Sequence, residues 1–399
     1  MSGGGLSKTA LDRMRGVLAG FVERGELPGL VAAVERRGET VVEAFGELRR
    51  DSVFRISSMS KPVIAAAALT LVEDGTVRLE EPVDRLLPEL AARRVLRSPD
   101  AELDDTVPAE RPILVRDLLT FTAGYGLVLA APGSLPIQRA MDERELGQGP
   151  PAPAVPPEPD EWLRRLGELP LLHQPGAEWR YNTGADILGV LISRACGGRP
   201  LEEVLRERLF GPLGMRETAF SVPPAQAHRL PPQTGTDFAT GAATAYDPGG
   251  AESQWARPPA FPSGAAGLVS TVDDYLAFAR MLLGQGRLPG WGRLLARPTV
   301  AAMTSDQLTE RQKRATVPFD PEFFEGQSWG LGLSVTTRRT GPATTPGSFG
   351  WAGGLGTAWA TDPAEQMNVL IFTQRAWASA TPPAVFQTFW NLTYAAIDD

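Results

Sequence analysis

The chain has 399 residues, with 39 basic and 47 acidic side chains and a net charge of −8 at neutral pH. This length is enough for two or three structural lobes, and the hydrophobic fraction of 43% is that of a folded globular protein. The acidic balance argues against nucleic acid or an anionic membrane surface as the main partner.

Three residue types are rare, and their scarcity excludes several kinds of site. The single cysteine, Cys196, allows no internal disulfide and no zinc site built on several thiolates. The two histidines, His173 and His228, are too far apart in sequence for a metalloprotease-type zinc motif, so we expect neither a metal nor a cofactor. There are three lysines: Lys8, Lys61 and Lys313.

The first twenty residues carry several charges and contain no apolar run of the signal-peptide kind. Nowhere is an uncharged stretch long enough to span a bilayer. We therefore expect a cytoplasmic protein with no membrane partner, and the oligomeric state stays open.

Hydrophobic periodicity and turn residues predict the elements in chain order. The first half is predicted to contain a helix, a hairpin of two strands and then four helices: Lys8–Arg24, Leu30–Glu35, Thr40–Phe45, Ile64–Val72, Arg116–Leu119, Asp186–Ala195 and Leu201–Leu209. The second half is predicted to contain a helix with Thr271 as its N-cap, three strands and a closing helix: Thr271–Leu283, Trp329–Thr337, Gly356–Thr361, Asn368–Gln374 and Pro383–Ile397. Two stretches, 147–160 and 223–264, are predicted to be loops because they are rich in Pro and Gly.

Strands at both ends and helices in the middle predict an α+β fold rather than alternating βαβ units. One antiparallel sheet would combine N- and C-terminal segments and be flanked by helices. We expect a sheet domain of residues 1–60 and 255–399, with a mainly helical domain inserted at 61–254 that carries the 147–160 loop.

The first candidate for chemistry is the S-x-x-K sequence Ser58-Met59-Ser60-Lys61 at the start of an apolar helix. Residues three apart share a helix face, so the hydroxyl and the amine can meet. The helix N-terminus favours developing negative charge, and apolar neighbours lower the pKa of a lysine. The alternative is a surface lysine after a Ser-rich turn.

A rival nucleophile is Ser328, because Gly326 to Gly330 fits G-x-S-x-G. A nucleophile elbow needs a strand before the serine, a helix after it and a later histidine. Here a loop precedes, a strand follows and no histidine comes later, so this hypothesis fails. We expect His173 and His228 to cap a turn or face solvent.

Two further segments are candidates for the site. Tyr181 precedes the helix predicted at Asp186–Ala195, so its hydroxyl can project into a cleft, unless it is a packed core tyrosine. The small residues between Gly347 and Thr357 would let a ligand approach closely, although a bulged hairpin edge fits equally well.

Together these segments resemble the serine β-lactamase and penicillin-binding-protein superfamily, in particular its class C-like branch and the family VIII carboxylesterases. The resemblance covers most of the chain, in order. It rests on Phe54–Pro62, Arg116–Gly124, Tyr181–Thr183, Phe210–Met215, Gly267–Tyr275 and Trp351–Gly353.

The resemblance implies that Ser58 is the acylated nucleophile and Lys61 its general base, with Tyr181 completing the catalytic group. It implies an oxyanion hole made by the backbone N–H groups of Ser58 and Gly354, in a cleft between the two domains. No cofactor is implied.

Two positions depart from the pattern of β-lactamases and DD-peptidases. Trp351 stands where those enzymes carry a cation, and Thr183 stands two residues after Tyr181 in place of Asn. Both departures are closer to the esterases and argue against substrates that carry a carboxylate.

The function predicted is hydrolysis of carboxylic esters with small or medium groups, a small-molecule substrate. The alternatives are a transacylase that passes the acyl group to an alcohol or amine, a β-lactamase or D-aminopeptidase, or a non-catalytic scaffold. We expect Trp351, Gly353 and Tyr125 to shape the substrate pocket, with the 147–160 loop either a lid or inert.

Overall fold

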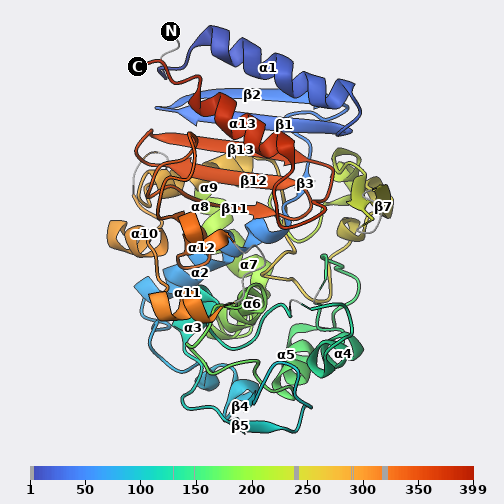
Figure 1. The fold of residues 1–399 in the computed structure, drawn as a ribbon, viewed down its shortest axis with the longest axis vertical. Helices are drawn as coiled ribbons and strands as arrows, with labels where there is room; N and C mark the ends of the chain where they lie inside the picture. Colours follow the sequence, from blue (N-terminus) through green and yellow to red (C-terminus); the bar gives the residue numbers. More distant parts are fainter. Residues whose placement is uncertain are drawn as a thin grey trace.

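The main sheet joins the two ends of the chain (Figure 1). The computed structural model describes residues 4–128, 130–147, 149–237, 242–288, 290, 292–316 and 322–399. Within them, seven antiparallel strands lie in the order β2 (Glu39–Gly46), β1 (Gly29–Arg36), β13 (Met367–Thr373), β12 (Thr357–Asp362), β11 (Phe349–Gly353), β10 (Ser334–Thr336) and β9 (Gln327–Trp329). The N-terminal hairpin therefore pairs directly with the C-terminal strand, which confirms the predicted α+β fold.

Alternate residues of β1 are buried on opposite faces of this sheet, as the two-residue period of a strand requires. Leu30, Ala32 and Val34 belong to a core with α1 (Lys8–Glu23) and α13 (Ala384–Tyr394). Val31 and Ala33 belong to the larger core, which contains α2 (Ser60–Glu73) and α9 (Val272–Leu283). The sheet is thus a layer between two sets of helices.

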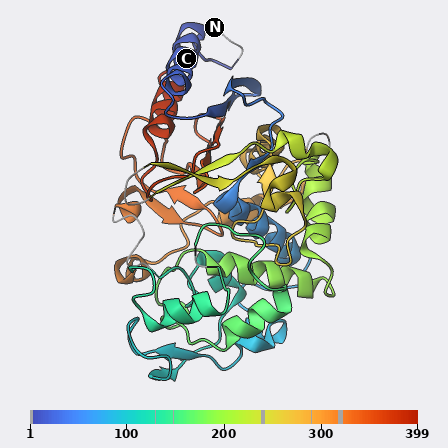
Figure 2. The same cartoon turned by 90° about the vertical axis from the view of Figure 1, so that its right-hand side faces the viewer.

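Among the remaining elements, α3 to α7 lie together below the sheet in Figures 1 and 2. The helices are α3 (Val115–Thr120), α4 (Pro136–Glu143), α5 (Pro159–Gly167), α6 (Thr183–Ala195), α7 (Leu201–Leu205), α8 (Gly211–Leu213), α10 (Arg297–Met303), α11 (Glu310–Ala315) and α12 (Phe323–Gly326). The small two-stranded sheets pair β3 (Phe54–Arg55) with β8 (Val269–Ser270), β4 (Arg94–Leu96) with β5 (Thr106–Pro108), and β6 (Gln233–Thr236) with β7 (Ala243–Asp247).

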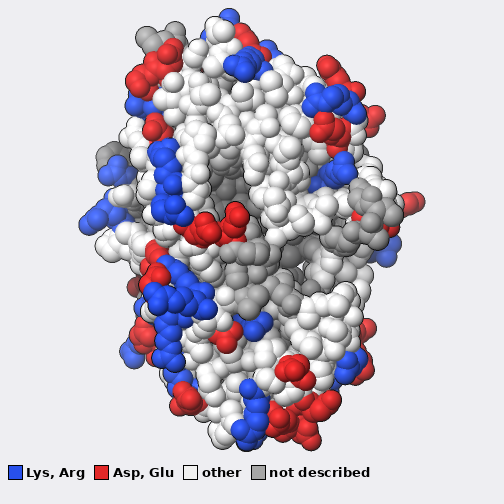
Figure 3. Space-filling model, in the orientation of Figure 1, with Lys and Arg blue, Asp and Glu red and all other residues white. Residues whose placement is uncertain are grey.

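None of the helices in the described ranges is long and apolar enough to cross a membrane. On the face drawn in Figure 3, acidic and basic side chains are interspersed, and they lie mainly toward its edges.

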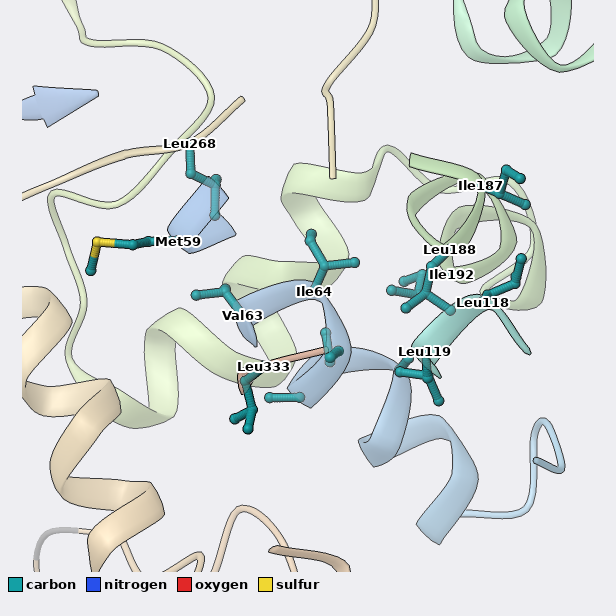
Figure 4. Packing of buried hydrophobic residues seen from close by; sticks show 14 of the residues in the cluster. Met59, Val63, Ile64, Leu118, Leu119, Ile187, Leu188, Ile192, Leu268 and Leu333 are labelled. Atoms are coloured by element: carbon teal, nitrogen blue, oxygen red, sulfur yellow. The ribbon is translucent and has the colours of Figure 1, made fainter. Parts of the chain in front are cut away.

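Helix α2 is apolar on all sides, and it is surrounded by other elements. Val63 and Ile64 lie among Leu118 of α3, Leu188 of α6 and Leu268, as Figure 4 shows. A helix buried all round is held by packing rather than by its own propensity. The residues at its N-terminal end are therefore fixed in position.

Two sequence predictions were wrong in detail. The single strand predicted at Trp329–Thr337 is two short strands, β9 and β10, because the chain reverses between them: Gly332 has φ +84°, and a Cβ there would lie 2.3 Å from Ala65 Cβ. The 223–264 stretch, predicted to be loop, contains the β6–β7 hairpin. That hairpin is held by bonds to a remote segment, such as the 2.9 Å bond from Thr234 N to Gln374 O.

Candidate active site

The chain turns sharply into α2 at the segment that carries Ser58. Residues Ser57–Met59 form a 3-10 turn, and Ser57 has φ +47°, in the left-handed region that costs a non-glycine residue energy. Ser58 is half-buried and borders a cavity. The turn therefore exposes the Ser58 hydroxyl at the start of a rigid helix.

Lys61 lies directly beside Ser58, one helical turn along. Its Nζ is 2.9 Å from Ser58 Oγ and donates a 2.8 Å hydrogen bond to the Ala265 carbonyl. Nζ also lies 4.4 Å from the centroid of the Tyr181 ring. The predicted meeting of hydroxyl and amine is thus present in the structure.

The environment of Lys61 suits a general base. The side chain is 1% exposed, and this burial lowers the pKa of Lys61 to about 7, against a smaller upward effect of the Asp186 carboxylate. A lysine with this pKa is partly neutral near pH 7, so its amine can take the proton of Ser58.

Tyr181 reaches the same point from the entrance to α6. The next residue, Asn182, has φ +92° and ψ −73°, a tight and strained turn, and the Tyr181 carbonyl accepts a 2.9 Å bond from Leu127 N. Burial raises the pKa of Tyr181, while hydrogen bonds with Ser58 and Trp351 oppose the rise. Tyr181 therefore keeps its proton and can act as a donor.

Trp351 contacts Tyr181. Its Nε1 donates a 2.7 Å hydrogen bond to the Tyr181 hydroxyl, and its ring packs edge-on against Trp329 with centroids 4.7 Å apart. Among the described residues, those that line the Ser58 cavity do not include Trp351 or Gly353. A substrate contact of either residue stays a prediction; the bond observed here joins Trp351 to the hydroxyl of Tyr181.

Gly353 and Gly354 bring the end of β11 next to the nucleophile segment. A Cβ on Gly353 would lie 2.3 Å from the Ile56 carbonyl oxygen, so only glycine fits there. Gly354 borders the same cavity as Ser58. In the part of the chain that the structure describes, neither the Ser58 N–H nor the Gly354 N–H donates to a backbone carbonyl. Both donors are available for an oxyanion.

The cavity in front of Ser58 has a volume of about 520 Å³, and the Pro-rich loop forms one of its walls. Gly147 and residues 149–153, 155 and 156 line it, while residue 148 is outside the described residues. Tyr246 of β7 also lines the cavity, and its hydroxyl donates to the Pro151 carbonyl of the Pro-rich loop. The sequence reasoning did not find Tyr246, because its contact partner lies 95 residues away.

Tyr125 does not shape this cavity, contrary to the prediction. It is 1% exposed and lies in the main core, with its hydroxyl 3.5 Å from the carbonyl oxygens of Leu166 and Leu169. Its side chain packs toward the end of α5 and so away from Ser58.

Ser328 and the two histidines lie in other environments than Ser58. Ser328 is fully buried in β9 and donates to Asp306 Oδ1. His173 is buried, its Nδ1 lies 3.0 Å from the Gln174 carbonyl, and burial lowers its pKa to about 4; His228 is exposed. No group of three or more potential metal ligands occurs among the described residues.

The chain is similar to several known proteins. The family model described as Beta-lactamase matches residues 14–382. Protein Rv1367c of Mycobacterium tuberculosis is 37% identical over 378 residues, covering 91% of this chain and 90% of the relative. Esterase EstB of Burkholderia gladioli is 30% identical over 404 residues, covering 93% and 92%. The structure of EstCE1, described as a hydrolase with promiscuous acyltransferase activity, matches with a TM-score of 0.77 at 25% identity, covering 97% and 99%.

The family match spans most of the chain, so this protein belongs to the beta-lactamase family. An antiparallel sheet between helices, with a helix buried beneath it, is the fold shared with these structures.

Proposed function

We propose that the chain cleaves carboxylic esters with small or medium groups through an acyl-enzyme on Ser58. Its family and its esterase relative make it a carboxylesterase-type serine hydrolase, and we place it with the family VIII carboxylesterases. The observation that carries the proposal is the 2.9 Å contact between Ser58 Oγ and the buried amine of Lys61.

In acylation, Ser58 Oγ attacks the ester carbonyl carbon while Lys61 takes the hydroxyl proton. The tetrahedral oxyanion accepts hydrogen bonds from the N–H groups of Ser58 and Gly354. Loss of one such donor typically costs about 3–4 kcal/mol of barrier.

Tyr181 then gives its proton to the departing alkoxide as the carbon–oxygen bond breaks, and the Lys61 ammonium returns a proton to Tyr181. In deacylation a water molecule attacks the acyl carbon and gives up a proton through Tyr181 to Lys61. Ser58 leaves with that proton, and the starting state is restored.

The cavity favours uncharged esters. Among its described lining residues, Asp186 is the one charged side chain, and the rest are mostly apolar, such as Leu127 and Phe261. A substrate carboxylate would find no cationic partner there, so the β-lactamase alternative is less well supported.

Transfer of the acyl group to an alcohol or amine is the second candidate. It is favoured by the Pro-rich wall, which covers the cavity with apolar surface and so limits water, and by the description of EstCE1. We further propose a cytoplasmic protein whose partner is a small ester rather than nucleic acid or a membrane, as the net charge of −8 favours.

The test is a panel of p-nitrophenyl esters from acetate to octanoate beside nitrocefin, with and without added alcohol. We expect turnover of the esters, little turnover of nitrocefin and no ester turnover by Ser58→Ala. A new ester formed with the added alcohol would identify transfer. Turnover of nitrocefin that exceeds turnover of every ester would refute the proposal.

A further inference from the structure

Asp186 is a buried carboxylate beside the site that the steps above do not use. It lies in the first turn of α6, is 7% exposed and borders the Ser58 cavity. Its Oδ1 accepts hydrogen bonds from Ser263 Oγ at 2.7 Å and from Ala265 N at 3.0 Å. A buried carboxylate needs such partners, because an uncompensated charge in the interior is costly.

One residue, Ala265, connects Asp186 to the general base. The Ala265 N–H donates to Asp186, and the Ala265 carbonyl accepts the 2.8 Å bond from Lys61 Nζ. The loop is pressed against α6 here, since a Cβ on Gly264 would lie 2.4 Å from the Ala185 carbonyl oxygen. The position of Asp186 therefore fixes the position of the carbonyl that holds Lys61.

The negative charge of Asp186 also raises the pKa of Lys61, against the effect of burial. Among the described residues, the amine also faces the Ala265 carbonyl, the Ser58 hydroxyl and the Tyr181 ring. Asp117 of α3, another buried carboxylate, is paired with Arg111 at 2.6 Å. Asp274 of α9 accepts from Glu217 N at 2.7 Å and Thr218 Oγ1 at 2.9 Å.

We propose that Asp186 is a positioning residue for Lys61: it orients the Ala265 carbonyl that binds the amine and places a negative charge beside it. This inference rests on the proposed function, in which Lys61 must become an ammonium as Ser58 attacks. A fixed negative charge stabilises that ammonium without reorganisation during the reaction. Burial favours the neutral amine and Asp186 favours the charged one, so the two effects together set the pH at which the base is active.

The test is the pH profile of kcat/KM for p-nitrophenyl butyrate from pH 5 to 9. In Asp186→Asn, which keeps the shape but removes the charge, we expect the maximum to fall about tenfold or more and the acid limb to move down by about one pH unit. The direction follows because loss of the negative charge makes the ammonium easier to deprotonate.

Asp274→Asn is the matched control, since Asp274 is also a buried aspartate in the first turn of a helix with similar bonds. Its acid limb is expected at the wild-type pH. If circular dichroism shows that Asp186→Asn is unfolded, the same prediction applies to Asp186→Ser. Asp186→Glu retains the charge, so its acid limb should stay at the wild-type pH.

The inference is overturned if Asp186→Asn or Asp186→Ser folds and its acid limb lies at the wild-type pH or at a higher pH. That result would leave the esterase proposal intact. Absence of ester turnover in the wild-type chain instead overturns the proposed function.

Discussion

The indole N–H of Trp351 donates a 2.7 Å hydrogen bond to the hydroxyl oxygen of Tyr181, which lies 170 residues earlier in the chain. This bond occupies a lone pair of the phenol, so the Tyr181 hydroxyl accepts from Trp351 and keeps its own proton for donation. An aromatic residue at this position therefore binds the hydroxyl of Tyr181, where the related β-lactamases are expected to carry a cation for the substrate.

Trp351→Phe removes this donor and keeps most of the aromatic packing. A neutral hydrogen bond contributes about 0.5–1.5 kcal/mol, so we expect kcat to fall about two- to tenfold with little change in KM. Trp359→Phe is the control, because Trp359 lies opposite on β12 and loses a comparable 2.9 Å bond to Thr361 Oγ1. An equal effect of both substitutions on kcat would contradict the assignment.

The activity of the wild-type chain is expected to rise with pH through about 7. The pKa of Lys61 is lowered to about 7, and only the neutral amine accepts the Ser58 proton, so kcat/KM grows as Lys61 loses its proton. Lys61→Met, which has no base, should lose activity by about a thousandfold or more at every pH. A profile that is flat from pH 5 to 9 contradicts the role of Lys61.

Tyr246→Phe tests the wall of the cavity. The substitution removes the hydrogen bond from the Tyr246 hydroxyl to the Pro151 carbonyl, which holds the Pro-rich loop against the β6–β7 hairpin. We expect KM for the octanoate ester to rise up to about fivefold, because a looser wall gives fewer apolar contacts, and KM for the acetate ester to stay constant. Tyr394→Phe, which loses a bond to Asp362 on the sheet, serves as control. A parallel change for both esters would show that the wall does not select acyl length.

Gly353→Ala tests the close approach of β11 to the nucleophile segment. The added Cβ would lie 2.3 Å from the Ile56 carbonyl oxygen, so we expect a loss of about 1–3 kcal/mol in the free energy of unfolding in urea. The neighbouring Gly354→Ala should keep the wild-type stability, because no heavy atom lies within 4 Å of its added Cβ. Equal stability of the two variants would contradict the packing described.

The parts of the site within one stretch of sequence could be predicted. Ser58 and Lys61 lie one helical turn apart, so the S-x-x-K spacing is enough to bring them together. Tyr125 was wrongly assigned because nothing local indicates that Leu166 and Leu169 cover it. The roles of Trp351, Tyr246 and Asp186 depend on contacts between remote segments, which spacing does not reveal.

In the fold, too, local features could be predicted and features that depend on remote contacts could not. The first helix and the first hairpin have strong periodicity and were predicted within one residue of their bounds, whereas the closing helix ends at Tyr394 rather than at the predicted Ile397. The β6–β7 hairpin was missed because Gln233–Thr236 lacks apolar alternation and obtains hydrogen bonds from the distant residues 374 and 376. The break between β9 and β10 follows from the contact of Gly332 with α2. This too is a contact between remote segments, which the local sequence does not reveal.

The most direct test of the account is the mass of the covalent intermediate. The chain is mixed rapidly with p-nitrophenyl butyrate, quenched in acid, digested and mapped by mass spectrometry, with Ser58→Ala and Ser328→Ala treated in parallel. We expect a butyryl group on Ser58 in the wild type and in Ser328→Ala, and none in Ser58→Ala. An acyl group on Ser328 or another residue, with turnover retained in Ser58→Ala, would contradict the central claim.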